Sequence, residues 1–266
     1  MTRSVFLLAA AAALVSGCFD NHGKSEDLPM VRDAAGLAGI KDGPYPGAEG
    51  REVRIVLRGF KGEIPQGALL VWPEVRTLDL SERALEAIPQ EVMSYPRLAE
   101  FYFVRNRLEA VPDALWRIPG LRYVNFDGNR LQSLGDGISE AKSLKWLRLN
   151  GNGLKSLPDG VASLKDLRRI YLKGNSLTAV PECLKSLDLL EDIALDDNAG
   201  ITEVPGWLTS LKSLKNISLS GTAVKRLPDD LSGWRSLRTL NMAGCPMSAD
   251  ERRRIREALP DVVMVF

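Results

Sequence analysis

A series of apolar residues recurs along the chain at a step of 23 residues. Between Leu144 and Leu154, leucines stand at the first, fourth, sixth and eleventh places of the series, and Asn152 stands at the ninth. A fixed internal period is the signature of a repeat architecture, so the pattern predicts an array of stacked units. The copies begin at Val75, Leu98, Leu121, Leu144, Leu167, Leu190, Leu214 and Leu237, with a step of 24 residues only between Leu190 and Leu214.

The alternation inside each copy predicts a β-strand. The fourth and sixth positions are apolar and point to one face, whereas the third, fifth and seventh positions point to the other. One such strand cannot bury its apolar face alone, so neighbouring copies are expected to stack into a continuous parallel sheet with a shared core. Prolines late in most copies, such as Pro158, hold the preceding residue extended. This favours short turns and 3₁₀ segments over long helices behind the sheet.

The ninth position predicts a ladder of hydrogen bonds inside the array. A side-chain amide offers both donors and an acceptor, so stacked amides can satisfy a turning backbone within the core. Glycine precedes this position in several copies, as Gly151 precedes Asn152, where the turn is expected to need a positive φ. Threonine and cysteine replace asparagine in the last two copies and are expected to do part of the same job. The predicted ladder is Asn106, Asn129, Asn152, Asn175, Asn198, Thr222 and Cys245.

The series L-x-x-L-x-L-x-x-N-x-L resembles the pattern of leucine-rich repeat proteins, and the resemblance covers about four-fifths of the chain. It implies an α/β repeat fold, a right-handed solenoid with a curved parallel sheet on its concave side and short turns on its convex side. The repeat domain is expected over residues 51–266, with a degenerate repeat at 51–74, regular repeats at 75–247 and a C-terminal cap at 248–266.

The cap is predicted to contain a helix. Ser248 and Glu251 have the spacing of a capping box, and the helix is expected to run through Leu259, with a final edge strand at 262–266. Its arginines are interpreted as a solvated outer face, with a phosphate or lipid-headgroup patch as the alternative. These arginines are Arg252, Arg253, Arg254 and Arg256.

The start of the chain predicts a secretory signal peptide over residues 1–17, because its apolar run is too short to cross a bilayer. Val15-Ser16-Gly17-Cys18 resembles the lipobox of bacterial lipoproteins, which implies lipidation of Cys18. Residues 18–50 are expected to form a flexible tether with one short helical turn around Val31 to Leu37. The implied location is the bacterial cell envelope, on the periplasmic side of either membrane or at the cell surface. An ordinary signal peptide with a chance cysteine is the alternative.

Charge and residue content narrow the function classes. Lys plus Arg (35) nearly cancels Asp plus Glu (34), so no general positive field favours nucleic acid. His22, the single histidine, lies in the predicted tether, which leaves the repeats without the usual base for serine or cysteine catalysis. Cys183 and Cys245 are interpreted as small buried residues. We therefore expect no enzyme activity, no cofactor, no metal and no nucleic-acid partner.

The outward face of the sheet predicts a binding surface. Tyrosine, tryptophan and arginine, which are enriched at interface hot spots, gather there in repeats two to five. Strands stack at roughly 4.8 Å, so four strands span about 15–20 Å, which suits a peptide or a protein edge. The predicted partner-binding residues are Tyr102, Tyr123, Asn125, Trp146, Arg148, Arg169, Tyr171 and Lys173.

The predicted function is a non-enzymatic scaffold that binds a protein or peptide on the concave sheet. One alternative for the surface is that its side chains only stack on one another, for example Trp146 with Arg169, in cation–π contacts worth about 0.5–1 kcal/mol each. One alternative for the whole protein is a surface-exposed adhesin or a structural envelope component that binds glycan or a host surface. The pattern leaves the oligomeric state open.

Overall fold

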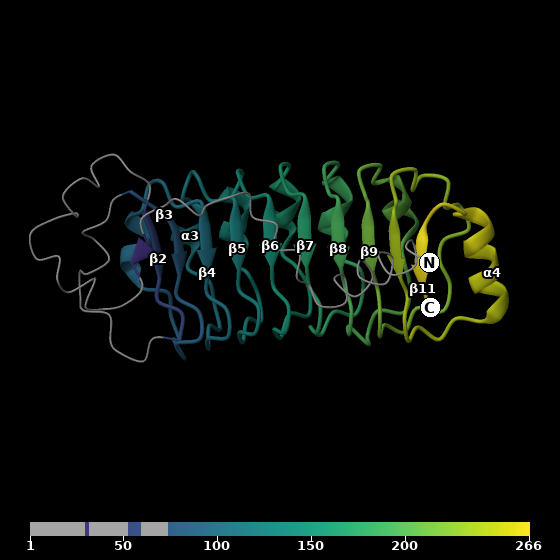
Figure 1. The fold of residues 1–266 in the computed structure, drawn as a ribbon, viewed down its shortest axis with the longest axis horizontal. Helices are drawn as coiled ribbons and strands as arrows, with labels where there is room; N and C mark the ends of the chain where they lie inside the picture. The colour runs from purple at the N-terminus through teal and green to yellow at the C-terminus, as the bar shows by residue number, and fades with distance from the viewer. Residues whose placement is uncertain (1–29, 32–52, 60–73) are drawn as a thin grey trace, which may run out of the picture.

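The computed structural model describes residues 30–31, 53–59 and 74–266. The predicted signal peptide, Cys18 and His22 lie outside the described residues, as do most of the predicted tether and part of the degenerate first repeat. The described strands succeed one another along the long axis of the molecule, and a helix stands at the C-terminal end (Figure 1).

Within the described residues, eleven strands form one parallel sheet in the order of the sequence. Thr77 lies beside Glu100, and Glu100 lies beside Tyr123, so these partners are 23 residues apart. Asp192 and Asn216 are 24 residues apart, which absorbs the one longer step of the pattern. The strands are β1 (Met30–Val31), β2 (Val53–Val56), β3 (Val75–Asp79), β4 (Glu100–Tyr102), β5 (Tyr123–Asn125), β6 (Trp146–Arg148), β7 (Arg169–Tyr171), β8 (Asp192–Ala194), β9 (Asn216–Ser218), β10 (Thr239–Asn241) and β11 (Val263–Val265).

The sheet begins earlier than the sequence predicts. Met30 and Val31 form β1, which pairs in parallel with Arg54 and Ile55 of β2. The helical turn predicted from Val31 is therefore wrong at that residue, and the tether prediction fails for this dipeptide. The physical reason is that the edge of a sheet offers a row of unpaired backbone groups, which an extended apolar dipeptide can satisfy.

The predicted alternation of faces is confirmed. Phe101, Leu147 and Ile170, at the fourth position of their repeats, are fully buried in the core. The residues that follow them in the chain lie on the other face of the sheet, where Tyr102 and Arg148 are half-buried. We call this other face the open face of the sheet.

Short segments return the chain from each strand to the next, as predicted. Pro158, with extended backbone, stands immediately before one of them, and prolines precede most of the others in the same way. The segments are the 3₁₀ helices η1 (Gln90–Ser94), η2 (Asp136–Glu140), η3 (Asp159–Ser163), η4 (Glu182–Ser186) and η5 (Gly206–Ser210) and the short helix α3 (Asp113–Trp116).

The eighth position of each repeat needs a positive φ, whichever residue occupies it. Gly151 has φ 62°, as predicted, but Glu82, Arg105 and Asp197 adopt φ of 60°, 52° and 56° at the same position. The turn is imposed by pairing, because the Gly151 N–H donates to the Lys173 carbonyl of the next repeat at 2.7 Å. For a residue other than glycine this positive φ is energetically unfavourable, because its Cβ crowds the backbone.

The asparagines of the predicted ladder join each repeat to the one before it. The Oδ1 atom of Asn152 accepts the Leu131 N–H at 3.0 Å. Its Nδ2 atom donates to the carbonyls of Phe126 and Leu149, both at 3.0 Å. The same kinds of bond to the preceding repeat are made by Asn106, Asn129, Asn175 and Asn198.

The last two positions of the ladder make fewer bonds. The Oγ1 atom of Thr222 donates to the Leu219 carbonyl at 2.7 Å. The Sγ atom of Cys245 donates to the same carbonyl at 3.1 Å and lies 3.4 Å from Thr222 Oγ1. Both side chains are buried, so they fill the position while offering a single donor each.

Helix α4 (Ala249–Ala258) closes the array. The Ser248 Oγ accepts the Glu251 N–H at 3.1 Å, which is the first half of the predicted capping box. The Glu251 carboxylate does not return to Ser248. It accepts the Leu227 N–H at 3.0 Å, and this bond joins the helix to the repeat that begins at Leu214.

The arginines of α4 do not share one solvated face, contrary to the sequence prediction. Arg254 pairs with Glu251 at 2.7 Å and donates to the Leu227 carbonyl at 3.1 Å, so its guanidinium lies against the repeat that begins at Leu214. The guanidinium groups of Arg252 and Arg256 lie 5.9 and 4.9 Å from the centre of the Phe266 ring. The predicted edge strand is present as β11, which pairs with β10.

Candidate functional site

The first group on the open face is an aromatic stack across three strands. The rings of Tyr102 and Tyr123 have centroids 4.8 Å apart, and those of Tyr123 and Trp146 are 5.6 Å apart. The Arg169 guanidinium lies 4.4 Å from the centre of the Trp146 ring. Register places Tyr123, Trp146 and Arg169 side by side, whereas Tyr102, whose register partner is Asn125, reaches Tyr123 diagonally. This part of the predicted surface is therefore one continuous stack.

A second stack runs beside the first. Its members, Arg148 and Tyr171, lie two residues further along their strands than Trp146 and Arg169. The Arg148 guanidinium lies 5.2 Å from the centre of the Tyr171 ring and 2.9 Å from the Asp127 carboxylate. Burial, the largest single cause, lowers the pKa of Arg148, but the charge and hydrogen bond of Asp127 together with the hydroxyls of Tyr123 and Tyr171 outweigh it, so the net shift of that pKa is upward. Arg148 is thus held as a fixed cation by partners from the chain itself.

The first stack continues into a polar network toward the C-terminus. Arg169 pairs with Asp192 at 3.0 Å, and the Asn216 amide donates to the same carboxylate at 2.6 Å. Burial, the largest cause, raises the pKa of Asp192 above its ordinary value, and the bond from Asn216 and the charge of Arg169 oppose it. The open face therefore changes from aromatic to hydrogen-bonded polar side chains over β7 to β9.

The predicted site residues do not all present themselves to a partner. Tyr123 is 5% exposed and Asn125 is 8% exposed, so the expectation of an exposed aromatic run is wrong at Tyr123. The Asn125 amide donates to the Tyr123 hydroxyl at 3.3 Å, so the hydroxyl has a partner within the chain. Lys173 pairs with Asp197 at 3.4 Å, and none of the stacking contacts of the open face includes it. The side chains therefore do stack on one another, as the alternative interpretation expects. Tyr102, Trp146 and Tyr171 are nevertheless only half-buried.

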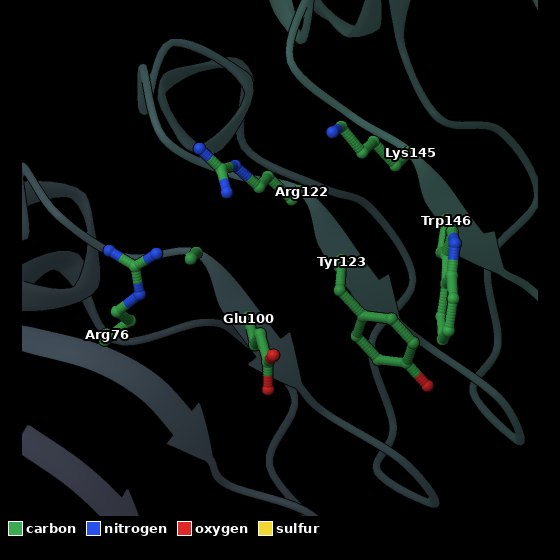
Figure 2. Close-up of a pocket in the computed structure, with 7 residues that line it drawn as sticks. Arg76, Glu100, Arg122, Tyr123, Lys145 and Trp146 are labelled. Carbon is green, nitrogen blue, oxygen red and sulfur yellow. The ribbon is translucent and has the colours of Figure 1, made fainter. Parts of the chain in front are cut away.

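An open hollow of about 240 Å³ lies against the first stack. Figure 2 shows Arg76, Arg122 and Lys145 along one rim, with Glu100, Tyr123 and Trp146 below them. Ala99 completes the lining. The second position of the repeat is not among the predicted site positions. The signal was present: basic residues recur there, and the small Ala99 interrupts them.

No group of three or more metal-ligating side chains occurs among the residues that the structure describes. In the same residues no helix is long and apolar enough to pass through a lipid bilayer. Cys183 and Cys245 are buried free thiols, as predicted, and burial raises the pKa of Cys183 to about 11. A thiol with such a pKa is protonated at neutral pH and is a poor nucleophile.

Comparison with known proteins places this geometry in a known fold. A family model described as leucine rich repeat matches residues 142–199. A leucine-rich repeat protein of Leptospira interrogans superposes with a TM-score of 0.56 at 22% identity, over 81% of this chain and 64% of that one. The fold is a leucine-rich repeat solenoid. No curated protein sequence matches the chain at a significant level.

Two further solved leucine-rich repeat structures have similar folds. An internalin from Listeria monocytogenes has a TM-score of 0.61 at 16% identity, over 80% of this chain and 64% of that one. The ectodomain of the Arabidopsis receptor kinase HAESA, in complex with a peptide hormone ligand, has a TM-score of 0.61 at 23% identity, over 73% of this chain and 34% of that one. The chain thus spans 64% of the length of the first two structures and about a third of the receptor ectodomain.

Proposed function

We propose that this leucine-rich repeat protein is a non-enzymatic scaffold that binds a protein or peptide partner on the open face of its sheet. The observation that carries the proposal is the combination of the aromatic stack of Tyr102, Tyr123 and Trp146 with the adjoining hollow. A stack fixed by its neighbours loses little side-chain entropy when a partner covers it, which favours binding by a preorganised surface. The hollow gives that surface relief and a place for a side chain of the partner.

A peptide or protein is favoured over a small metabolite by the extent of the surface. The contacts reach from β4 to β8 through side chains that touch in series. Five strands at about 4.8 Å spacing place its ends nearly 20 Å apart. The HAESA ectodomain, which has a similar fold, binds a peptide hormone in its solved complex. A peptide lying across several strands would use the whole length of the surface.

We further propose that the protein is held at a membrane of the bacterial envelope by lipid on Cys18. The lipobox-like residues Val15 to Cys18 support this proposal. Expression in a bacterial host with a labelled fatty acid tests it, with Cys183→Ala as the matched control. We expect Cys18→Ala to lose the label and Cys183→Ala to keep it. Label on Cys18→Ala, or none on the wild type, would contradict the anchor.

The binding proposal is tested by affinity capture from the native envelope with Trp146→Ala/Tyr171→Ala as bait. The matched control is Asp113→Ala/Glu182→Ala, which changes two exposed residues of the segments behind the sheet. We expect the partner recovered by the wild type and by the control to be lost from the open-face variant, provided that circular dichroism shows it folded. Equal recovery by both double variants would refute binding on the open face.

A further inference from the structure

The second position of the repeat forms a row of side chains at the edge of the open face. Backbone bonds connect its members directly: the Ala99 N–H donates to the Arg76 carbonyl and the Arg122 N–H to the Ala99 carbonyl, both at 2.8 Å. Most members are cations. In chain order the row is Arg76, Ala99, Arg122, Lys145, Arg168, Glu191, Lys215 and Arg238.

The row contains an internal example of a carboxylate between two cations. Glu191 lies between Arg168 and Lys215 and pairs with each of them at 2.9 Å. The three residues come from successive repeats, so the geometry is set by the stacking of the strands. A carboxylate attached at the middle strand therefore reaches the cations on both neighbouring strands.

The same arrangement occurs a second time without the carboxylate. Ala99 occupies the middle place between Arg76 and Arg122, as Glu191 does between its two cations. Its methyl group cannot fill the space that a glutamate side chain takes, and this is where the hollow of about 240 Å³ lies (Figure 2). Lys145, on the next strand, adds a third cation to the rim.

Among the residues that the structure describes, one carboxylate lines this hollow. Among the described residues, no ion pair involves Arg122 or Lys145. Glu100 is the acidic residue of the lining, and its carboxylate accepts bonds from the hydroxyls of Thr77 at 3.4 Å and Tyr102 at 3.3 Å. The lining side chains carry three positive charges and one negative charge, and Arg122 and Lys145 on this rim can complement an anion.

We propose that the hollow over Ala99 receives the side-chain carboxylate of a glutamate or aspartate of the bound peptide, in a place equivalent to the one that the Glu191 carboxylate fills further along the row. The inference rests on the proposed function and names the chemistry of its ligand. The carboxylate lies between Arg76 and Arg122, and the apolar part of the same residue or its neighbour lies against Tyr123 and Trp146. The partner is therefore an acidic segment.

The first test needs no ligand. Ala99→Glu supplies the missing carboxylate from the chain, so we expect a higher melting temperature at low salt and a smaller gain at high salt, because salt screens exposed pairs. Glu191→Ala is the reciprocal variant and is expected to lower the melting temperature in the same salt-dependent way. A melting temperature unchanged or lowered in Ala99→Glu would show that a carboxylate does not fit between Arg76 and Arg122.

The second test measures the ligand preference of the full chain. The probes are two labelled libraries of N-acetylated, C-amidated heptapeptides with random flanks and either glutamate or glutamine at the centre, followed by fluorescence anisotropy. We expect the glutamate library to bind about 2- to 5-fold more tightly for each cation that it engages, the range of exposed ion pairs. Arg122→Gln and Ala99→Glu should each reduce the preference. Arg238→Gln, which removes an exposed cation of the same row outside the hollow, should leave it unchanged.

The outcomes separate this inference from the proposed function. Equal binding of both libraries, or a preference that survives Ala99→Glu, overturns the carboxylate site, and the capture experiment with the open-face double variant still decides whether the face binds a partner. A third library, with central glutamine and a free C-terminus, identifies the source of the carboxylate. Binding of that library as tight as that of the glutamate library would assign the hollow to a chain terminus and overturn the side-chain assignment.

Discussion

The asparagine ladder and the second-position row both run along the sheet with one residue in each repeat, yet they differ in how uniform they are. Asn129, Asn152 and Asn175 make the same backbone bonds from one repeat to the next. The second-position row changes from cation to alanine to glutamate. From Asn106 to Asn198 the position that meets the same backbone keeps one chemistry, and Thr222 and Cys245 replace asparagine toward the end of the array, whereas the outward-facing position varies within the array. We therefore expect ligand specificity to depend on the second position, where the residue type changes from repeat to repeat.

The largest expected effect comes from breaking the ladder at its centre. Asn152→Ala removes the acceptor of the Leu131 N–H and the donors to Phe126 and Leu149, leaving buried backbone groups unsatisfied. We expect the free energy of unfolding to fall by about 1–3 kcal/mol. Chemical denaturation measures it. Asn150→Ala, which loses one bond from the Lys173 N–H at the open face, is the control and should cost less. An unchanged unfolding midpoint for Asn152→Ala would refute the role of the ladder.

A smaller effect on the free energy of unfolding is expected at Thr222, where the ladder position makes fewer hydrogen bonds. Thr222→Val keeps the shape of the side chain and removes one hydroxyl that donates to the Leu219 carbonyl. We expect a loss of about 1 kcal/mol in the free energy of unfolding, the net value of one buried hydrogen bond. The same denaturation experiment checks it. A loss as large as that of Asn152→Ala would show that the number of bonds at this position does not set its contribution.

The C-terminal part of the open face is expected to respond to pH. Asp196 is buried and accepts a bond from the Ser218 hydroxyl, and its pKa is raised chiefly by burial, with the bond from Ser218 opposing the shift. Because the folded-state pKa lies above the ordinary 3.8, the stability that protonated Asp196 contributes is complete below that pH and is lost as pH rises through the raised pKa.

Asp196→Asn removes this titration. We therefore expect the variant to gain in melting temperature relative to the wild type between pH 3 and pH 7, by about 1–3 °C. Thermal scans at several pH values measure the difference. Asp113→Asn, at an exposed position behind the sheet, is the control for the same change of residue type. A relative gain that shrinks as pH rises would contradict the upward shift of the Asp196 pKa.

The smallest effect on folding is expected in the second-position row. Arg122 is exposed, so Arg122→Gln should change the free energy of unfolding by less than about 0.5 kcal/mol while it weakens the preference for the acidic library. Asn129→Ala, a ladder substitution in the same repeat, should lower the free energy of unfolding and leave the preference for the acidic library unchanged. If Arg122→Gln unfolded the protein as readily as Asn129→Ala, the distinction between the two positions would fail.

Most of the fold could be predicted from the sequence because the same pattern of residues recurs in each repeat and indicates the same contacts each time. The period indicated the strands, their parallel order and the buried fourth position, and proline placement indicated the short return segments. Met30–Val31 could not be predicted as a strand, because a dipeptide has no period and pairs only where a sheet edge is available. Arg254 was assigned to the solvent because helical spacing does not reveal which carbonyls of the preceding repeat lie within its reach.

The candidate site was only partly predictable. The sequence identified the residue types on the open face and the stacking partners Trp146 and Arg169, because parallel register makes equivalent positions neighbours. It could not give the burial of Tyr123, which depends on rings that close over it from both sides. The hollow depends on Ala99, which is small where its neighbours in the row are long, and an alanine carries no sign of binding in the sequence by itself.

Site-specific photocrosslinking in the native envelope tests the central claim most directly. A photoreactive amino acid replaces Tyr102, half-buried on the open face, or Asp113, exposed on the return segment behind the sheet. We predict a discrete crosslinked partner from position 102, lost when Trp146→Ala is added, and no such product from position 113. Equal products from both positions, or a product from position 113 alone, would contradict binding on the open face.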